Sequence, residues 1–398
     1  MKRILIVHYA GDYREADRLR REEGKEMYYG HGYVLDQLAA LREAQHEVGF
    51  LCCLAPAYWE QLENGVTVIG AGTNPDKDPG PVLKLIEQYD PTHLLIQGPM
   101  LPLIRWGLTR GIRLGVVLAD SFANHYYRLI RFRKLPALLN DPRISLVSNH
   151  GDNAARALVA FGVRADRVIA WDFPHVRSPD LFAAKRRPGR LPFSLFYVGS
   201  VLAKKGVGDL IRAVALLRNQ FDIRLEIAGV GKVDRFRKLA ALLGIADRVR
   251  FLGLVPNNNI PQMMHASDAV VVPSRHSFPE GLPLTLYEAL AARTPVIASD
   301  HPMFAGHLVH GESAMIFRAG RPRALANAIA ELLSNTALYA RISAGSPAAW
   351  HHMQTPVKWG EMVARWTRGS ADDEGWLKAH SIAVRDGAAA AESAAVLI

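Results

Sequence analysis

Short apolar runs alternate along the first half of the chain with longer stretches in which apolar residues recur every three or four positions. Residues 3–10, 47–55, 93–98 and 112–120 have the length and composition of buried strands, whereas residues 32–45 show the periodicity of an amphipathic helix. This alternation predicts βαβ units, in which each helix returns the chain to the next parallel strand.

The alternation starts again after residues 177–192, a basic stretch that is rich in proline and glycine and has no periodicity. A second series of strands and helices then runs from residue 193 to residue 335. The pattern therefore predicts an α/β protein with two Rossmann-like parallel-sheet domains that face one another across a cleft, with ligands at the carboxyl ends of the strands. We expect a first domain at 1–188 and a second at 189–350. The alanine-rich end, 381–398, carries no core pattern and is predicted to be mobile.

Length and composition support two globular domains. The chain has 398 residues, more than the roughly 250–300 residues at which a single hydrophobic core stops growing. Cys52 and Cys53 lie in an apolar run and are predicted to be buried and reduced. No secretory signal precedes the first predicted strand, and no apolar run reaches the ~18 residues of a membrane span. These features predict a cytoplasmic protein.

The net charge of +10 favours anionic partners such as a phosphorylated substrate or an anionic membrane surface. Nucleic acid would fit the charge as well. However, nucleic-acid binding would require aromatic residues interleaved with basic ones, or a helix-turn-helix or zinc motif, and the sequence has none of these. We therefore expect no nucleic-acid partner.

The strongest chemical signal is the segment FPEGLPLTLYEALA, residues 278–291, which places Glu280 in a loop and Glu288 on the helix that follows. Pro283 lies near the first helical position, where a missing N–H costs nothing. Eight residues of helix span about 12 Å, and the helix N-terminus between the two carboxylates attracts a phosphate. A sugar, a diphosphate and a ribose laid end to end would span that distance.

This segment, continued to PSRHSFPEGLPLTLYEALAARTPVIASD, resembles the E-x7-E motif of glycosyltransferase family 4, whose members are retaining enzymes with the two-domain GT-B fold. FYVGSVLAKKGVGDLIRAVALL resembles the same family's G-R-L-x-x-x-K-G segment. The similarity is high over residues 193–335 and moderate over residues 1–188. The family also returns to its first domain through a helical segment, which would be residues 351–380 here.

The resemblance implies a role for each matching residue. Glu280 would contact the hydroxyls of the donor sugar, Glu288 would bind the ribose hydroxyls, and Lys205 would contact the diphosphate. Glu280, Lys205 and Asp120 are therefore the candidate catalytic residues. The candidate donor-binding residues are Gly32 with its neighbour Gly30, Gly199, Ser200, Lys204, Lys205, Gly229, Val255, Gly281, Leu282, Pro283, Leu284 and Glu288.

Physical reasoning supports these roles, because glycosyl transfer builds negative charge on the departing diphosphate and positive charge on the sugar. Lys205 and a helix N-terminus would stabilise the first charge, and a carboxylate near the anomeric carbon would stabilise the second. We therefore expect neither a metal ion nor any other cofactor, and we expect the nucleotide sugar to be a substrate.

The chain departs from the family pattern at several positions. Ser200 replaces the arginine that would join Lys205 on the phosphates, and Lys204 is a possible substitute. Ala119 replaces the histidine beside the donor sugar, a place that Asp120, Ser121 or His125 could fill. The family's Gly-Gly after a late strand is His301-Pro302, and its next glutamate falls near His307.

Three other signals favour ordinary structure over chemistry. Gly229 and Gly231 imitate a dinucleotide fingerprint, but its third glycine is Asp234, so we expect no NAD. Asp76-Lys77-Asp78 matches a metal-binding D-x-D but lies among prolines and glycines, which favours a turn. His351 and His352 adjoin Trp350 and are expected to pack rather than to bind a metal.

Arg128, Arg131 and Lys134 recur at helical spacing beside apolar residues, forming the candidate acceptor-side face. Such a basic surface can bind a phosphorylated acceptor, or it can lie on the inner side of an anionic membrane. A solvated face is the plain alternative.

Together, the sequence predicts a retaining, metal-independent transferase that moves a hexose from a nucleotide sugar, with a UDP-sugar as first guess. The acceptor would be a saccharide or a lipid-linked saccharide in bacterial polysaccharide or glycolipid synthesis. Two alternatives stay open. One is a nucleotide-sugar-binding protein with weakened catalysis, and the other is an enzyme of the same fold that acts on the sugar nucleotide without an acceptor.

Overall fold

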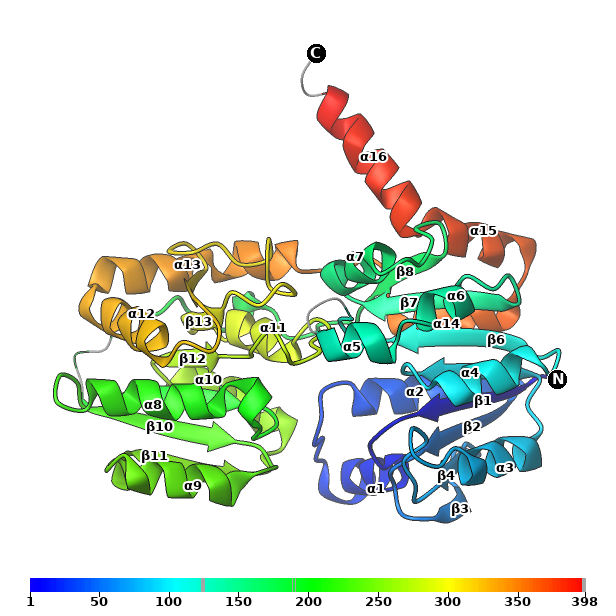
Figure 1. Cartoon of the computed structure of the whole chain (residues 1–398), viewed down its shortest axis with the longest axis horizontal. Helices are drawn as coiled ribbons and strands as arrows, with labels where there is room; N and C mark the ends of the chain where they lie inside the picture. Colours follow the sequence, from blue (N-terminus) through cyan, green and yellow to red (C-terminus); the bar gives the residue numbers. More distant parts are fainter. Residues whose placement is uncertain (123–125, 188, 190, 396–398) are drawn as a thin grey trace. The chain divides into compact units, whose positions relative to one another are not determined.

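The computed structural model describes residues 1–122, 126–187, 189 and 191–395. The chain forms two compact units, each built on one sheet (Figure 1). The first unit comprises Met1–Phe173, Glu280–Leu282 and Thr355–Ile398, and the second comprises Pro174–Pro279 and Pro283–Gln354. The α/β class and the two parallel-sheet domains are confirmed.

The first domain ends earlier than the predicted residue 188, because the chain after Phe173 is tied into the second unit. The Lys185 ammonium donates to the carbonyl of His265 at 2.7 Å, and its backbone N–H donates to the Ser343 hydroxyl at 2.7 Å. The basic stretch that the sequence marks as a linker is therefore part of the second unit's surface.

The first unit has an eight-stranded sheet in the order β3-β4-β2-β1-β5-β6-β7-β8, and all neighbouring strands are parallel except β3 and β4. The strands are β1 (Arg3–His8), β2 (Glu47–Cys52), β3 (Tyr58–Gln61), β4 (Thr67–Gly70), β5 (His93–Gln97), β6 (Arg113–Leu118), β7 (Ile144–His150) and β8 (Val168–Trp171). The helices are α1 (Tyr13–Glu23), α2 (His31–Glu43), α3 (Gly80–Tyr89), α4 (Leu101–Leu108), α5 (Tyr126–Arg131), α6 (Leu135–Leu139), α7 (Asp152–Ala160), α14 (Trp359–Arg368), α15 (Ala371–Ala379) and α16 (Ile382–Ala395).

Strand β1 shows why both faces of this sheet must be covered. Ile4 and Ile6 belong to one core cluster, Leu5 and Val7 belong to another, and all four are 0% exposed. Successive side chains of a strand point to opposite faces, so an unbroken apolar run requires helices on both sides of the sheet.

Helix α14, from the end of the chain, completes one of these faces. Trp359 and Trp366 are buried in the cluster that also contains Leu95 and Val117 of the sheet. Gly115 on β6 makes room for this helix, because a Cβ there would lie 2.6 Å from Leu95 Cδ1 and 3.2 Å from the Trp366 ring. The segment from Thr355 onward is thus part of the first unit's core.

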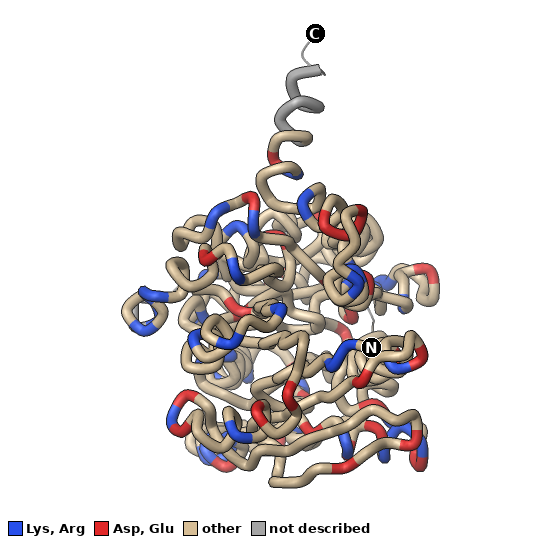
Figure 2. Tube along the Cα trace, turned by 90° about the vertical axis from the view of Figure 1, so that its right-hand side faces the viewer, with Lys and Arg blue, Asp and Glu red and all other residues tan. Residues whose placement is uncertain are grey.

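The predicted mobile tail is instead helical within the described residues. Helix α16 begins at Ile382, which is buried in the first unit's core, and Arg385 pairs with Asp152 at 2.5 Å. In two perpendicular views α16 points away from the rest of its unit (Figures 1 and 2). Alanine has the highest helix propensity, which explains a helix without a continuous core pattern.

The second unit has a six-stranded, fully parallel sheet in the order β11-β10-β9-β12-β13-β14. Its strands are β9 (Phe193–Val198), β10 (Ile223–Ala228), β11 (Val249–Gly253), β12 (Ala269–Val272), β13 (Val296–Ser299) and β14 (Ala314–Phe317). The helices are α8 (Val207–Leu217), α9 (Val233–Leu242), α10 (Ile260–Ala266), α11 (Leu284–Ala291), α12 (Pro322–Ser334) and α13 (Thr336–His352), and short 3-10 turns include η2 (Ala203–Lys205) and η4 (Asn257–Asn259).

Two smaller expectations can be compared with this fold. Cys52 and Cys53 are buried free thiols, as predicted, and burial raises the pKa of each to about 12. Within the part of the chain that the structure describes, no helix combines the length and the apolar character needed to cross a membrane.

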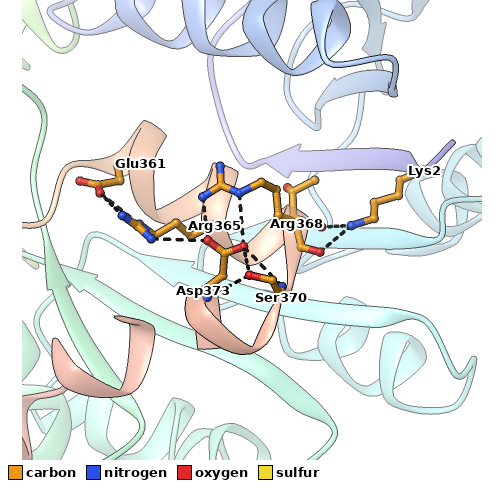
Figure 3. Close-up of polar contacts among 7 residues, drawn as sticks. Lys2, Glu361, Arg365, Arg368, Ser370 and Asp373 are labelled. Atoms are coloured by element: carbon orange, nitrogen blue, oxygen red, sulfur yellow. Dashed lines mark hydrogen bonds and ion pairs between the residues drawn. The ribbon is translucent and has the colours of Figure 1, made fainter. Parts of the chain in front are cut away.

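Asp373 organises the polar contacts of the C-terminal segment (Figure 3). Its carboxylate accepts hydrogen bonds from Arg368 Nη2 at 2.7 Å and from the Ser370 hydroxyl at 2.8 Å, and the Ser370 hydroxyl in turn accepts the Asp373 N–H, which forms a capping box at the start of α15. The Lys2 ammonium donates to the Arg368 carbonyl at 2.8 Å, which joins the first strand to this segment. Hydrogen bonds from Arg368 and then Ser370 lower the pKa of Asp373 to about 2.

We expect Asp373→Asn to lower the melting temperature at pH 7 by a few degrees. A carboxyl whose folded pKa is depressed stabilises the fold above its unfolded pKa of about 3.9, and this contribution is lost as pH falls toward 2. The difference between wild type and variant should therefore shrink below pH 4. Asp372→Asn, an exposed neighbour in the same helical turn, is the control. A pH-independent difference would contradict the assignment.

Candidate functional site

The turns at the carboxyl ends of the second unit's strands pack backbone against backbone. A Cβ on Gly229, which has φ +138°, would lie 1.9 Å from the Gly199 carbonyl oxygen, and one on Gly206, with φ +77°, would lie 2.0 Å from the Pro273 carbonyl oxygen. Only glycine fits such contacts. The predicted donor-binding residues Gly199 and Gly229 are therefore brought together, and packing alone explains the glycines that imitate a dinucleotide fingerprint.

Lys205 lies beside the loop that follows β12. Its ammonium is 4.4 Å from the centre of the Phe278 ring, and the N–H of Arg275 donates to the Lys204 carbonyl at 2.9 Å. The Lys204 side chain is exposed and Ser200 is exposed as well. The β9–α8 turn and the loop that leads into Glu280 thus form one local structure.

Asp209 and Arg275 hold that structure together, and neither was predicted from the sequence. Arg275 donates from Nε and Nη2 to the two Asp209 oxygens at 2.7 and 2.6 Å, in a bidentate ion pair. Asp209 is 2% exposed. Arg275 is committed to this pair and therefore does not replace the family arginine that Ser200 lacks.

His301, a departure from the family pattern, supports the same loop. The N–H of Met303 donates to His301 Nδ1 at 3.2 Å, which makes Nδ1 an acceptor and leaves Nε2 to donate to the Phe278 carbonyl at 3.1 Å. The ring is fully buried. His301 therefore positions the loop that contacts Lys205.

Both glutamates of the E-x7-E segment are buried, Glu280 at 5% exposure and Glu288 at 8%. Glu280 precedes α11, which begins after Pro283, and it belongs to the first unit together with Gly281 and Leu282. Glu288 lies within α11 and accepts a hydrogen bond from Asn257 Nδ2 at 2.5 Å.

Asn257 was also missed, although it lies in the polar run 257–259 between a strand and a helix. It is buried, and Arg177 donates to its backbone carbonyl at 3.3 Å and to its Oδ1 at 3.5 Å, which leaves Nδ2 to donate to Glu288. Two other predicted donor-binding residues are half-buried, Val255 just before Asn257 in the chain and Leu284 at the start of α11.

The first unit contains a pocket of about 710 Å³ at the carboxyl ends of its strands. It is lined by the terminal residues of five strands, which are His8, Gln97, Leu118, His150 and Trp171, and also by Asp120, the third candidate catalytic residue. The backbone of Asp120 is held by Asn149, which accepts the Asp120 N–H at 3.2 Å and donates to its carbonyl at 2.9 Å. Desolvation raises the pKa of Asp120 despite nearby Arg128.

The predicted acceptor-side face does not point outward as a whole. Arg128 and Arg131 line the pocket, where Arg128 lies 3.5 Å from Asp120 Oδ1 and Arg131 lies 2.6 Å from Asp76 Oδ2. Arg131 and Lys134 are exposed and Arg128 is half-buried, and Lys134 is the one of the three outside the pocket lining. The candidate acceptor-side face therefore divides into a half-buried Arg128 inside the pocket and an Arg131 and a Lys134 that are open to solvent, and its role stays a prediction.

The glycine-rich turn of the first unit forms the start of α2. Gly30, with φ +93°, is its N-cap, and the Gly32 N–H donates to the Glu26 carboxylate at 2.8 Å. The Glu26 carboxylate therefore binds at the N-terminus of α2, where the helix macrodipole favours a negative charge.

The weaker signals resolve as ordinary structure. Asp76-Lys77-Asp78 lies in a turn, as expected. His351 and His352 are exposed, but the His351 ring meets Trp350 edge to face at 5.1 Å between centroids and the His352 ring lies 6.1 Å from that of His307. Within the described parts of the chain, no group of three His, Cys, Asp or Glu side chains could hold a metal ion. His125 lies outside the described residues, and Ser121 is buried.

Solved structures of the same architecture cover nearly the whole chain. The sucrose-phosphate synthase of Thermosynechococcus elongatus superposes with a TM-score of 0.68 at 17% identity, covering 93% of this chain and 99% of the other. Anabaena HepE, solved in complex with UDP-glucose, gives a TM-score of 0.65 at 19% identity, covering 89% and 95%. The chain has the GT-B fold.

Within this GT-B chain, residues 182–347 match the family model described as glycosyl transferases group 1. A phosphatidyl-myo-inositol mannosyltransferase of Mycobacterium leprae is 35% identical over 147 residues, which are 36% of this chain and 38% of that protein. The lipopolysaccharide core biosynthesis mannosyltransferase LpcC of Rhizobium leguminosarum bv. viciae is 33% identical over 177 residues, 43% and 48% of the two chains. These matches span less than half the length of the curated relatives.

The comparisons show the GT-B fold and a match of residues 182–347 to a glycosyltransferase family model. Membership of family 4 and the role of the E-x7-E motif stay predictions.

We expect Asp209→Asn to destabilise the second unit by about 1.5–3 kcal/mol, because it breaks a charged hydrogen-bond pair at a buried carboxylate. Urea unfolding followed by circular dichroism measures this. Asp234→Asn removes the exposed pair with Arg237 and should change stability little. Equal effects of the two substitutions would contradict a structural role for the Asp209–Arg275 pair.

Proposed function

We propose that the chain is a retaining, metal-independent glycosyltransferase that transfers a hexose from a nucleotide sugar to a saccharide or a lipid-linked saccharide. One observation carries the proposal. In the second unit Lys205 lies against Phe278, and two buried glutamates, Glu280 and Glu288, follow this residue in the chain. A cation and two carboxylates in this order suit a sugar nucleotide, whose diphosphate is anionic and whose sugar and ribose offer hydroxyls.

The comparisons support the donor class. Relatives are named mannosyltransferases and glycosyltransferases, and the HepE structure was solved with UDP-glucose. A UDP-sugar is therefore our first choice of donor. Transfer would stabilise positive charge on the sugar through Glu280, as carboxylates do in glycoside hydrolysis.

A contact with an anionic membrane also stays a prediction for the face of Arg128, Arg131 and Lys134, of which Arg131 and Lys134 are exposed. Sedimentation with anionic and with neutral vesicles at low salt tests it.

Chelator should leave transfer activity intact, because Lys205 and the N-terminus of α11 would stabilise the leaving diphosphate without a metal ion. The measurement is nucleotide release from a panel of nucleotide sugars and acceptors, with and without EDTA. Loss of most activity in EDTA, restored by magnesium or manganese, would overturn metal independence.

Substitutions of the two glutamates should affect different kinetic constants. Glu280→Ala should lower kcat by ~100-fold or more with little change in donor KM, as expected for an interaction made mainly in the transition state. Glu288→Ala should mainly raise the donor KM, by the equivalent of roughly 2–3 kcal/mol, because its hydrogen bonds to ribose exist in ground and transition states alike. Lys205→Ala should change both constants.

Both constants are measured after circular dichroism has verified folding. Glu331→Ala, an exposed glutamate of α12, is the control. If Glu280→Ala changes only KM, or Glu288→Ala changes only kcat, the donor lies along this helix in the opposite direction.

A further inference from the structure

A second hollow of about 410 Å³ adjoins the first unit's pocket. The two share Tyr9, Asp76, Arg131 and Phe132 in their linings, so they are direct neighbours. We call them the strand-end pocket and the side pocket. They differ in charge, and this difference indicates what each can bind.

The strand-end pocket has no net charge. Its charged lining residues are Asp76, Asp120, Arg128 and Arg131, which form two ion pairs. Burial lowers the pKa of His8 and lowers that of His31 to about 4, so both rings are neutral at pH 7. Arg131 is paired with Asp76, whereas Nε and Nη2 of the half-buried Arg128 have no hydrogen-bond partner among the described residues and can donate to the oxygens of a ligand hydroxyl. Ligand hydroxyl groups can also donate to the two carboxylates.

A buried histidine–aspartate pair adds a hydrogen-bond acceptor to this pocket. His150 Nε2 lies 3.0 Å from Asp172 Oδ1, and Asp172 is 0% exposed. Because a carboxylate only accepts, Nε2 carries the proton and Nδ1 is left as an acceptor. His150 Nδ1 makes no hydrogen bond with any residue that the structure describes, and it is accessible to solvent. Asp172 thus sets the tautomer of a ring nitrogen that a ligand hydroxyl can reach.

Aromatic side chains form much of the remaining wall. The His150 ring stacks on Trp171 with centroids 4.6 Å apart, and Phe173 meets Trp171 edge to face at 5.2 Å. Such faces suit the apolar C–H side of a sugar or cyclitol ring, while the polar groups bond its hydroxyls.

The side pocket is positively charged. Its lining adds Lys77 and Arg105 to the Asp76–Arg131 pair, which gives a net charge of +2. Both side chains are exposed, and neither has an ion-pair or hydrogen-bond partner among the described residues. A phosphate monoester, which carries −1.5 to −2 charges at pH 7, matches two cations without carboxylate partners.

We propose that these two hollows form the acceptor site and that the acceptor is a polyhydroxylated ring bearing a phosphate group. The ring binds in the strand-end pocket, where His150 Nδ1 accepts a hydrogen bond from a hydroxyl and Asp172 is a positioning residue. The phosphate binds Lys77 and Arg105 in the side pocket. The assignment to an acceptor rests on the proposed function, whereas the two-part binding site stands on the first unit alone.

Ligand-observed NMR on the full chain tests this with glucose, myo-inositol and their monophosphates as probes. The phosphorylated probes should bind on the order of tenfold tighter than the neutral ones, and the advantage should shrink as salt is raised. Lys77→Gln/Arg105→Gln should remove this advantage and leave neutral binding unchanged. Lys84→Gln/Arg110→Gln, which changes the net charge equally in the same unit but outside both hollows, should preserve it.

His150→Ala and Asp172→Asn should weaken neutral and phosphorylated probes alike, and His380→Ala should weaken neither. The proposal is overturned if no phosphorylated probe binds more tightly than its neutral partner, or if the two double variants behave alike. It is also overturned if His150→Ala leaves binding unchanged, or if Lys77 and Arg105 affect only binding to anionic vesicles. A thermal shift with UDP on the same samples reports donor binding separately, so failure of the proposed function is distinguishable.

Discussion

Both sheets are parallel, so both must be covered on two faces, and much of the structure follows from this constraint. In the first unit the apolar strands cannot be sealed by the helices that connect them. Helix α14 supplies the missing cover, with Trp359 and Trp366 packed on Leu95 and Val117. Because Gly115 has no side chain, the Trp366 ring can pack directly on the strand at this position. The first unit is therefore built from both ends of the chain, although its sheet is complete before residue 173.

In the second unit the corresponding constraint is the close approach of the turns at the strand ends. Glycine backbones in contact leave no space between the turns after β9 and β10, and the Asp209–Arg275 pair fixes the loop after β12 against them. This edge carries Lys205, which lies against Phe278, shortly before the two glutamates in the chain. On such a scaffold the backbone needs little rearrangement when a ligand binds, because its packing already fixes the positions from which the binding side chains extend.

The sequence predicted the fold class well because its signals are local and repeated. Strand and helix periodicities are read from neighbouring residues, and both parallel sheets were expected. The site was predicted only where a motif spans one loop, as for Glu280, Glu288 and Lys205. Asn257, Asp209, His301, His150 and Asp172 act through partners far away in the sequence, and periodicity carries no information about such pairs. Arg128 shows the opposite error, because helical spacing suggested an outward position whereas the side chain is half-buried beside Asp120 in a pocket.

The position of α14 also has a consequence for biosynthesis. A ribosome releases the first sheet long before it releases Trp359 and Trp366, and the whole second unit is made in between. Throughout that interval the surface around Leu95 and Val117 lacks its cover and exposes apolar side chains to solvent, which is the condition that favours aggregation and chaperone binding. The nascent first unit can thus reach its final packing only after Trp366 has emerged, while the second unit, which lies almost entirely within 174–354, can fold before that.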